Sequence, residues 1–159
     1  MWSTEIENIL VTSKNFLGCF PLDKLPYFPQ RFPASLIVNT DTSKGNGDHW
    51  LALVLDKNKC FYFDSFGLPA VEKYLLNYLE PYYNTVTYSD VCIQHIQSNK
   101  CGKFCILFVK HVKNKTTYDK FLSNFNHENL QENDAIVEQW MGKGIKRILF
   151  ELLSVERRK

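Results

Sequence analysis

The order of apolar and polar residues along the 159-residue chain predicts strands in its middle part. The segment 49–55 is almost continuously apolar, which is typical of a central strand covered on both faces. The segment 60–64 follows after a short polar turn at 56–59, so it is the expected antiparallel neighbour of that strand. Short strands are also expected over 35–39 and 85–88.

Helices are expected where apolar residues recur every three or four positions. This spacing predicts helices over 4–13, 70–80, 101–113, 130–141 and 145–156. Four prolines predict an irregular segment over 18–34, and turn-forming residues predict a loop over 42–48. Because the strands lie in the middle and helices lie toward both ends, the chain is expected to have an α+β fold.

Composition indicates an ordinary globular protein, with 45% hydrophobic and 23% charged residues, and the length fits a single domain over 1–159. A net charge of +2 excludes a strongly basic nucleic-acid binder as the default expectation. No apolar run approaches the roughly 20 residues of a membrane span, and no secretory signal is evident. The five cysteines are an odd number, so we expect mostly free thiols in a reducing, intracellular compartment.

Cys101 is the cysteine best placed to act as a nucleophile. It lies where a polar run gives way to the apolar helix over 101–113, with Ser98 or Asn99 as the expected cap. The unpaired N–H groups at a helix N-terminus lower the pKa of a thiol, and Gly102 allows close approach of the backbone. On position alone, reactivity and simple burial are about equally supported for Cys101.

The other cysteines carry weaker signals. Cys105 lies in an apolar stretch and is expected in the core, and Cys60 is expected to pack within its strand. The sequence assigns no role to Cys19 or Cys92.

His49 and Asp64 form the best candidate pair of base and carboxylate. A hairpin that turns at 56–59 places residues whose numbers sum to about 115 opposite each other, and 49 and 64 sum to 113. The two side chains are therefore expected close enough to form a hydrogen bond. Taken singly, each residue is more simply explained as solvated, but together with Cys101 they indicate nucleophilic catalysis.

Acyl transfer also requires donors where the oxyanion forms. The sequence offers Gln94 and Gln97 just before Cys101, together with the backbone N–H of Cys101 at the helix start.

The order His49-Trp50, then Asp64 in FDSFG, then Gln94 and Cys101-Gly102, resembles the adenovirus protease (adenain) family and the related ubiquitin-like-protein-specific proteases. The upstream segments Phe16-Leu-Gly18 and Ile37-Val-Asn-Thr40 look like the adenovirus branch. The resemblance covers about residues 16–67 and 94–113.

This resemblance implies a single cysteine protease domain with a mixed, mostly antiparallel sheet, flanking helices and the nucleophile at the N-terminus of a central helix. It implies Cys101 as nucleophile, His49 as general base and acid, and Asp64 as the orienting carboxylate, where the adenovirus branch has Glu. Gln94, with the backbone at Cys101 and Gly102, would form the oxyanion hole. The family cleaves after small residues at Gly-containing sites, and a narrow cleft near Gly45, Gly47 and Trp50 would suit such substrates.

The resemblance also bears on partners. It implies protein substrates, in particular viral structural or capsid precursors, and places a viral protein in the infected-cell nucleus and the virion. The adenovirus enzyme is activated by a peptide and by DNA, so the resemblance implies both activators and a weak DNA contact. The region that carries the activating peptide in that enzyme looks shorter here, so our default expectation is that no cofactor is required. We also expect a monomer that has no contact with a membrane.

Two alternatives remain at this point. One keeps the chemistry but makes the substrate a ubiquitin-like modifier, as in a deSUMOylase. The other is a zinc-stabilised binding module, whose ligands would be Cys92, His95, Cys101 and Cys105. The main hypothesis expects no metal site.

Overall fold

The computed structural model describes residues 1–143 of the chain. They form a five-stranded mixed sheet, whose strands lie side by side in their order along the chain. The strands are β1 (Phe16–Pro21), β2 (Ala34–Asn39), β3 (Trp50–Leu55), β4 (Cys60–Phe63) and β5 (Val86–Thr87). The two central pairings are antiparallel and the two edge pairings are parallel. The expected α+β fold with a mixed sheet is confirmed.

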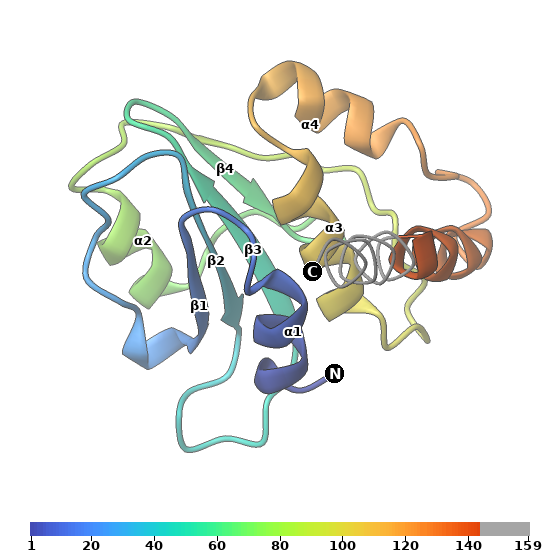
Figure 1. The fold of residues 1–159 in the computed structure, drawn as a ribbon, viewed down its shortest axis with the longest axis horizontal. Helices are drawn as coiled ribbons and strands as arrows, with labels where there is room; N and C mark the ends of the chain where they lie inside the picture. Colours follow the sequence, from blue (N-terminus) through green and yellow to red (C-terminus); the bar gives the residue numbers. More distant parts are fainter. Residues whose placement is uncertain (144–159) are drawn as a thin grey trace, which may run out of the picture.

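Helices cover both faces of this sheet (Figure 1). One face carries α1 (Ser3–Leu10), α3 (Cys101–His111), α4 (Lys115–Leu122) and a helix over 132–143. The other face carries α2 (Lys73–Leu79) and the short 3-10 helix η1 (Leu22–Lys24). The expected helix over 145–156 lies outside the described residues. No helix within residues 1–143 is long and apolar enough to cross a bilayer.

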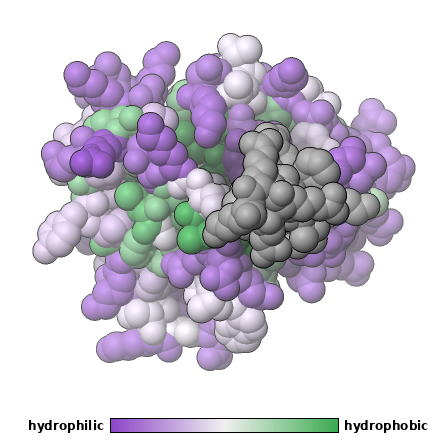
Figure 2. Space-filling model, viewed as in Figure 1, coloured by the Kyte–Doolittle hydropathy of each residue, from purple (hydrophilic) through white to green (hydrophobic). Residues whose placement is uncertain are grey.

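Alternation along the strands divides the core into two layers. In β2, Leu36 and Val38 pack toward α2, whereas Ile37 packs toward α3. All six residues of β2 are buried, as expected for a strand covered on both faces. On the face shown in Figure 2, hydrophilic residues dominate the outline and apolar ones appear mainly toward the middle. The sheet is therefore covered on both faces, and the loops at its ends are the parts that reach the surface.

The register of the central hairpin agrees with the arithmetic from the sequence. Ala52 lies opposite Phe63, and Leu55 lies opposite Cys60, so each pair of numbers sums to 115. This register brings the residue before β3 and the residue after β4 to the same end of the hairpin.

Two elements differ from the sequence-based expectation. The segment expected to be irregular over 18–34 contains most of β1, an edge strand that ends at Pro21, where the missing N–H costs no ladder bond. The helix α4 was not expected because its apolar face is short. Its start does carry a recognisable signal, since the Asn114 side chain accepts a hydrogen bond from the Thr117 N–H at 2.9 Å.

Candidate active site

His49 and Asp64 lie at the same end of the β3–β4 hairpin, immediately outside the two strands. The His49 Nε2 lies 2.8 Å from Oδ1 of Asp64. The same carboxylate oxygen accepts the backbone N–H of Phe66 at 2.8 Å, which fixes the carboxylate. The Phe66 ring stacks on the imidazole with 4.8 Å between ring centroids. The imidazole is therefore held by a hydrogen bond at one edge and by a ring on one face.

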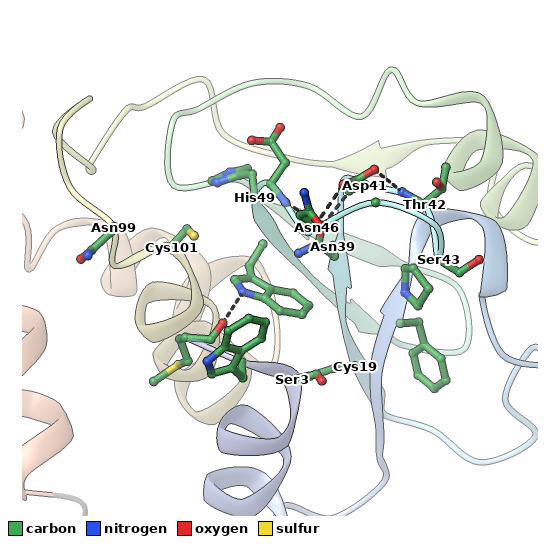
Figure 3. A pocket seen from close by; sticks show the side chains of 18 of the residues that line it. Ser3, Cys19, Asn39, Asp41, Thr42, Ser43, Asn46, His49, Asn99 and Cys101 are labelled. Atoms are coloured by element: carbon green, nitrogen blue, oxygen red, sulfur yellow. Dashed lines mark hydrogen bonds between the residues drawn. The ribbon is translucent and has the colours of Figure 1, made fainter.

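Cys101 is the first residue of α3, as expected. Because Asp64 occupies Nε2 of the imidazole, Nδ1 is the nitrogen left to face the Cys101 sulfur. Figure 3 shows the Cys101 side chain at the start of its helix, facing His49 across the cleft. Thus three side chains that are separated in the sequence form one linked group of thiol, imidazole and carboxylate.

The start of α3 packs closely on β3. A Cβ placed on Gly102 would lie 3.2 Å from both Met1 Sδ and Trp50 Cδ1. One turn later, the Cys105 thiol donates to the Trp50 carbonyl at 3.2 Å. Because residue 102 is glycine, the start of α3, which carries Cys101, can lie close to the start of β3, which His49 directly precedes.

The pKa values of His49 and Cys101 move in opposite directions. Burial lowers the pKa of His49, but hydrogen bonds to Asp64 and Cys101 and their negative charges outweigh it and raise the pKa to about 9. Burial raises the pKa of Cys101, but the hydrogen bond from His49 and the backbone N–H groups of Trp50 and Gly102 outweigh it, so that this pKa is lowered. The pair therefore favours a thiolate beside an imidazolium.

The pKa values of three other cysteines are raised, opposite to that of Cys101. Burial raises the pKa of Cys60 to about 12, and burial with the nearby Glu7 carboxylate raises that of Cys19 to about 12. Burial also raises the pKa of Cys105 well above its ordinary value. Because thiolates are the reactive form, Cys101 is the thiol that the electrostatics favour.

Gln94 lies in the same cleft and is almost fully buried. Its side-chain Nε2 donates one N–H to the Ser98 carbonyl at 2.8 Å, and its Oε1 accepts from the Ser65 hydroxyl at 2.6 Å. A primary amide has two N–H groups, so one stays available toward the cleft. Gln97 is exposed and is not among the residues that line the cleft, so of the two glutamines Gln94 is the one placed beside Cys101 and His49.

The N-terminus of α3 is not capped by a side chain. The expected caps Ser98 and Asn99 are wrong, because the N-cap residue is Lys100 and no side-chain hydrogen bond closes the helix. The Ser98 hydroxyl instead donates to Asp134 in the helix over 132–143, at 2.7 Å. The first N–H groups of α3, including that of Cys101, therefore face the cleft without a capping side chain.

The cleft has a volume of about 670 Å³, and it is lined by Cys101, His49, Gln94 and the expected residues Gly45, Gly47 and Trp50. The loop between β2 and β3 forms one wall. Asn39 holds this loop closed, because its Oδ1 accepts the N–H of Asp41 at 2.9 Å and of Asp48 at 3.1 Å. Gly47 has a φ of +85°, a conformation that favours glycine.

Several residues of this region were not expected from the sequence. Met1, Trp2 and Cys19 also line the cleft, and the Trp50 indole N–H donates to the Met1 carbonyl at 3.2 Å. No periodic pattern in the sequence predicts these contacts, because they depend on how α1 and β1 pack in the folded protein. Ser65 was equally unmarked, although it directly follows Asp64.

The ligand set of the zinc alternative does not gather. Cys92 bonds to the Gln94 carbonyl, Cys105 bonds to the Trp50 carbonyl, and His95 Nδ1 accepts the Gln97 N–H. Within residues 1–143, no group of three or more His, Cys, Asp or Glu residues could hold a metal ion. The zinc-module alternative is therefore not supported.

A thiol at a helix start, facing an imidazole that a carboxylate orients, is the arrangement that defines cysteine-type peptidases. Comparison with known proteins agrees with that class. The sequence profile described as adenovirus endoprotease matches residues 16–139, which is most of the chain. The chain belongs to the adenovirus endoprotease family.

Individual relatives match only part of the chain, at 26% to 37% sequence identity. The chain is 31% identical over 111 residues to the protease of avian adenovirus 8, a match that covers 59% of this chain and 53% of that protein. A 54-residue match to the protease of fowl adenovirus A serotype 1 is 37% identical and covers 33% of this chain and 26% of that protein. A protein of African swine fever virus named SUMO-1 cysteine protease is 26% identical over 99 residues, which cover 55% of this chain and 36% of that protein. The chain thus spans about half the length of the first of these relatives and less of the others.

Proposed function

We propose that this protein is a viral cysteine endopeptidase that uses Cys101, His49 and Asp64 as its catalytic residues. The observation that carries the proposal is geometric: the Asp64 carboxylate holds the His49 imidazole at 2.8 Å, in the same cleft as the Cys101 thiol at the start of α3. The raised pKa of His49 and the lowered pKa of Cys101 are consistent with this arrangement. Family membership supports the same chemistry.

In the first half of the reaction, the Cys101 thiolate attacks the carbonyl carbon of the scissile peptide bond. The Gln94 side-chain N–H and the Cys101 backbone N–H donate to the oxyanion, and the adjacent Gly102 N–H helps to hold the sulfur. The imidazolium of His49 then gives its proton to the departing amine, and a thioester remains on Cys101.

In the second half, the neutral imidazole takes a proton from water, whose oxygen attacks the thioester carbon. Collapse of the intermediate releases the carboxylic acid and restores the thiolate and imidazolium. Asp64 keeps its negative charge throughout and stabilises the imidazolium each time it forms. Thiolate, proton donor and oxyanion donors all come from this chain, so we propose a reaction that requires no metal or cofactor.

We propose that the substrates are proteins cut after small residues, as in structural precursors of a virus. Trp50 and Met1 line the same cleft as Cys101, and both would lie 3.2 Å from a Cβ on the adjacent Gly102, which supports close packing at this end of the cleft. Glycine or alanine in the substrate would fit there better than a branched side chain.

The second candidate substrate is the C-terminus of a ubiquitin-like modifier, and the name of the swine fever virus relative favours testing it. A panel that contains modifier C-terminal fusions and virion precursor proteins with Gly-containing sites separates the two. We expect cleavage of the precursors, and cleavage of modifier fusions alone would overturn this choice of substrate.

We further propose that the protein acts as a monomer and needs neither a peptide nor DNA for activity. Turnover measured with and without mixed-sequence duplex DNA tests the second point, and a rate that rises more than about tenfold with DNA would contradict it. Sedimentation velocity across the assay concentrations tests the first.

The reaction itself is tested by thiol labelling with an electrophilic peptide that ends in glycine. We expect one adduct on Cys101 in the wild type, none in Cys101→Ala, and a greatly slowed reaction in His49→Ala. Cys92→Ala is the matched control, since it removes a partly exposed thiol that is not part of the proposed site. Labelling of Cys19 or Cys60 instead would refute the assignment.

A further inference from the structure

Ser65 is fully buried and directly follows Asp64 at the end of the central hairpin. Its hydroxyl donates to Oε1 of Gln94 at 2.6 Å. Its carbonyl accepts the backbone N–H groups of Ile93 and Gln94 at 2.9 Å and 3.0 Å. A single residue thus holds both the main chain and the side chain of Gln94.

These contacts determine which way the Gln94 amide faces. Its oxygen is capped by the Ser65 hydroxyl, and one of its N–H groups is taken by the Ser98 carbonyl. A flipped amide would place Oε1 against that carbonyl, two acceptors facing each other, so the flip is disfavoured. In this orientation the group left for the cleft, which Gln94 lines, is the second N–H rather than the amide oxygen.

The segment over 93–98, which contains Gln94, is also bonded to the helix over 132–143. Ser98 is anchored by Asp134, and the Ile93 carbonyl accepts Nδ2 of the buried Asn133 at 2.8 Å. The segment over 93–98 therefore lies between the hairpin end on one side and the helix over 132–143 on the other. Ser65 contributes the one hydroxyl of this arrangement that reaches the Gln94 amide oxygen.

We infer that Ser65 is a positioning residue for the oxyanion-binding amide of Gln94. The inference rests on the proposed function. It gives the two consecutive residues at the hairpin end separate tasks, since Asp64 orients the imidazole and Ser65 orients the amide. One short chain segment would then set both the proton-transfer group and the oxyanion donor relative to Cys101.

A buried serine that served only stability would behave differently. Its loss would slow every reaction of Cys101 alike, because it would disturb the fold of the whole site. A positioning role affects only reactions that build up an oxyanion. Alkylation of Cys101 by iodoacetamide consumes the thiolate but forms no oxyanion, so it separates the two explanations.

The experiment compares Ser65→Ala, Gln94→Ala, the double variant and Ser35→Ala, a buried serine of β2 that serves as the control. The assays are turnover of a fluorogenic peptide amide with glycine at the cleaved position and alkylation by iodoacetamide. For Ser65→Ala we expect kcat to fall about 10- to 100-fold, short of the roughly 10²- to 10³-fold loss expected without any donor. The KM and the alkylation rate should stay within about twofold of the wild type.

In the Gln94→Ala background, Ser65→Ala should cause no further loss of kcat, because the residue acts through that amide. Full activity of Ser65→Ala, losses that multiply in the double variant, or an equal fall in alkylation would each overturn the inference. Ser35→Ala should match the wild type in both assays.

A nuclear magnetic resonance measurement keeps this inference separate from the proposed function. The side-chain amide protons of Gln94, assigned by their loss in Gln94→Ala, should exchange slowly in the wild type and faster in Ser65→Ala. A wild type that alkylates at Cys101 but cleaves no peptide would defeat the proposed function. Unchanged exchange of these protons in Ser65→Ala would defeat the inference, whatever the turnover.

Discussion

Oδ1 of Asp64 lies 2.8 Å from Nε2 of His49, although 15 residues separate them in the chain. The contact is a consequence of strand register, since His49 directly precedes β3, Asp64 directly follows β4, and the two strands pair as one antiparallel hairpin. A slip of the hairpin by one residue would turn the two side chains to opposite faces of the sheet. The buried apolar residues of both strands, which fix the register, therefore also fix the distance between imidazole and carboxylate.

Asp64→Asn should remove the charge that stabilises the imidazolium while keeping the shape of the side chain. We expect kcat/KM to fall by about 10²- to 10⁴-fold, and the alkaline limb of the pH profile to move to lower pH because the pKa of His49 falls. Asp119→Asn removes an equal charge from the exposed surface of α4 and should leave both unchanged. Equal activities of the two variants would contradict the role of Asp64.

The pH dependence of peptide hydrolysis should be bell-shaped. Activity should rise through the lowered pKa of Cys101 as the thiolate forms, and fall through the pKa of about 9 of His49 as the proton needed by the leaving amine is lost. The alkaline limb should thus lie well above the 6.5 of an ordinary imidazole.

Iodoacetamide alkylation provides the matching control for this pH profile. It should share the acid limb but show no alkaline fall, since the thiolate persists and no proton is donated. In His49→Ala the acid limb should move up toward the ordinary thiol pKa of 9.0, because the stabilising partner is gone. An unchanged acid limb in that variant would show that His49 does not stabilise the thiolate.

Gly102→Ala should weaken activity through packing rather than through chemistry. The added Cβ would lie 3.2 Å from Met1 Sδ and from Trp50 Cδ1, closer than ordinary van der Waals contact, so these side chains and the start of α3 have to separate by a few tenths of an ångström. We expect at least a tenfold loss of kcat/KM, measured with the peptide amide. Gly142→Ala is the control, because no atom of residues 1–143 lies within 4 Å of its added Cβ, and it should keep full activity.

The central hairpin and the site at its end were predictable from the sequence because both depend on local order. An apolar strand, a short turn and a second strand set the register, and the register alone brings His49 near Asp64. The position of Cys101 at a helix start was likewise visible where polar residues give way to apolar ones. The lowered pKa of Cys101 was expected in direction from its place at a helix start. The raised pKa of His49 was not predictable, since it depends on contacts between distant segments.

The remaining parts of the site depend on tertiary packing. β1 was missed because the four prolines of the segment 18–34 indicate irregular structure, although an edge strand tolerates Pro21 at its end. The contacts of Ser65 with Gln94 and of Ser98 with Asp134 join segments that no short-range pattern relates. The prediction of a single domain over 1–159 stays a prediction.

Asn133 offers the last test, because it is fully buried and connects three segments. Its Nδ2 donates to the carbonyls of Ile93 and Asn126, and its Oδ1 accepts the Asn126 N–H at 2.7 Å. Asn133→Ala would leave these backbone groups unpaired inside the protein, at a cost of about 1–3 kcal/mol for each group that water does not reach. We expect a loss of about 2–4 kcal/mol in the free energy of unfolding, measured by urea denaturation.

The same variant should also lower kcat, because the Ile93 carbonyl anchors the segment that carries Gln94. Asn129→Ala is the matched control, since Asn129 is exposed and its side chain bonds only to Glu132 within the described residues. It should change the free energy of unfolding by less than about 0.5 kcal/mol. If Asn133→Ala were destabilised yet kept wild-type kcat below its unfolding transition, the helix over 132–143 would support the fold without contributing to the geometry of the oxyanion site.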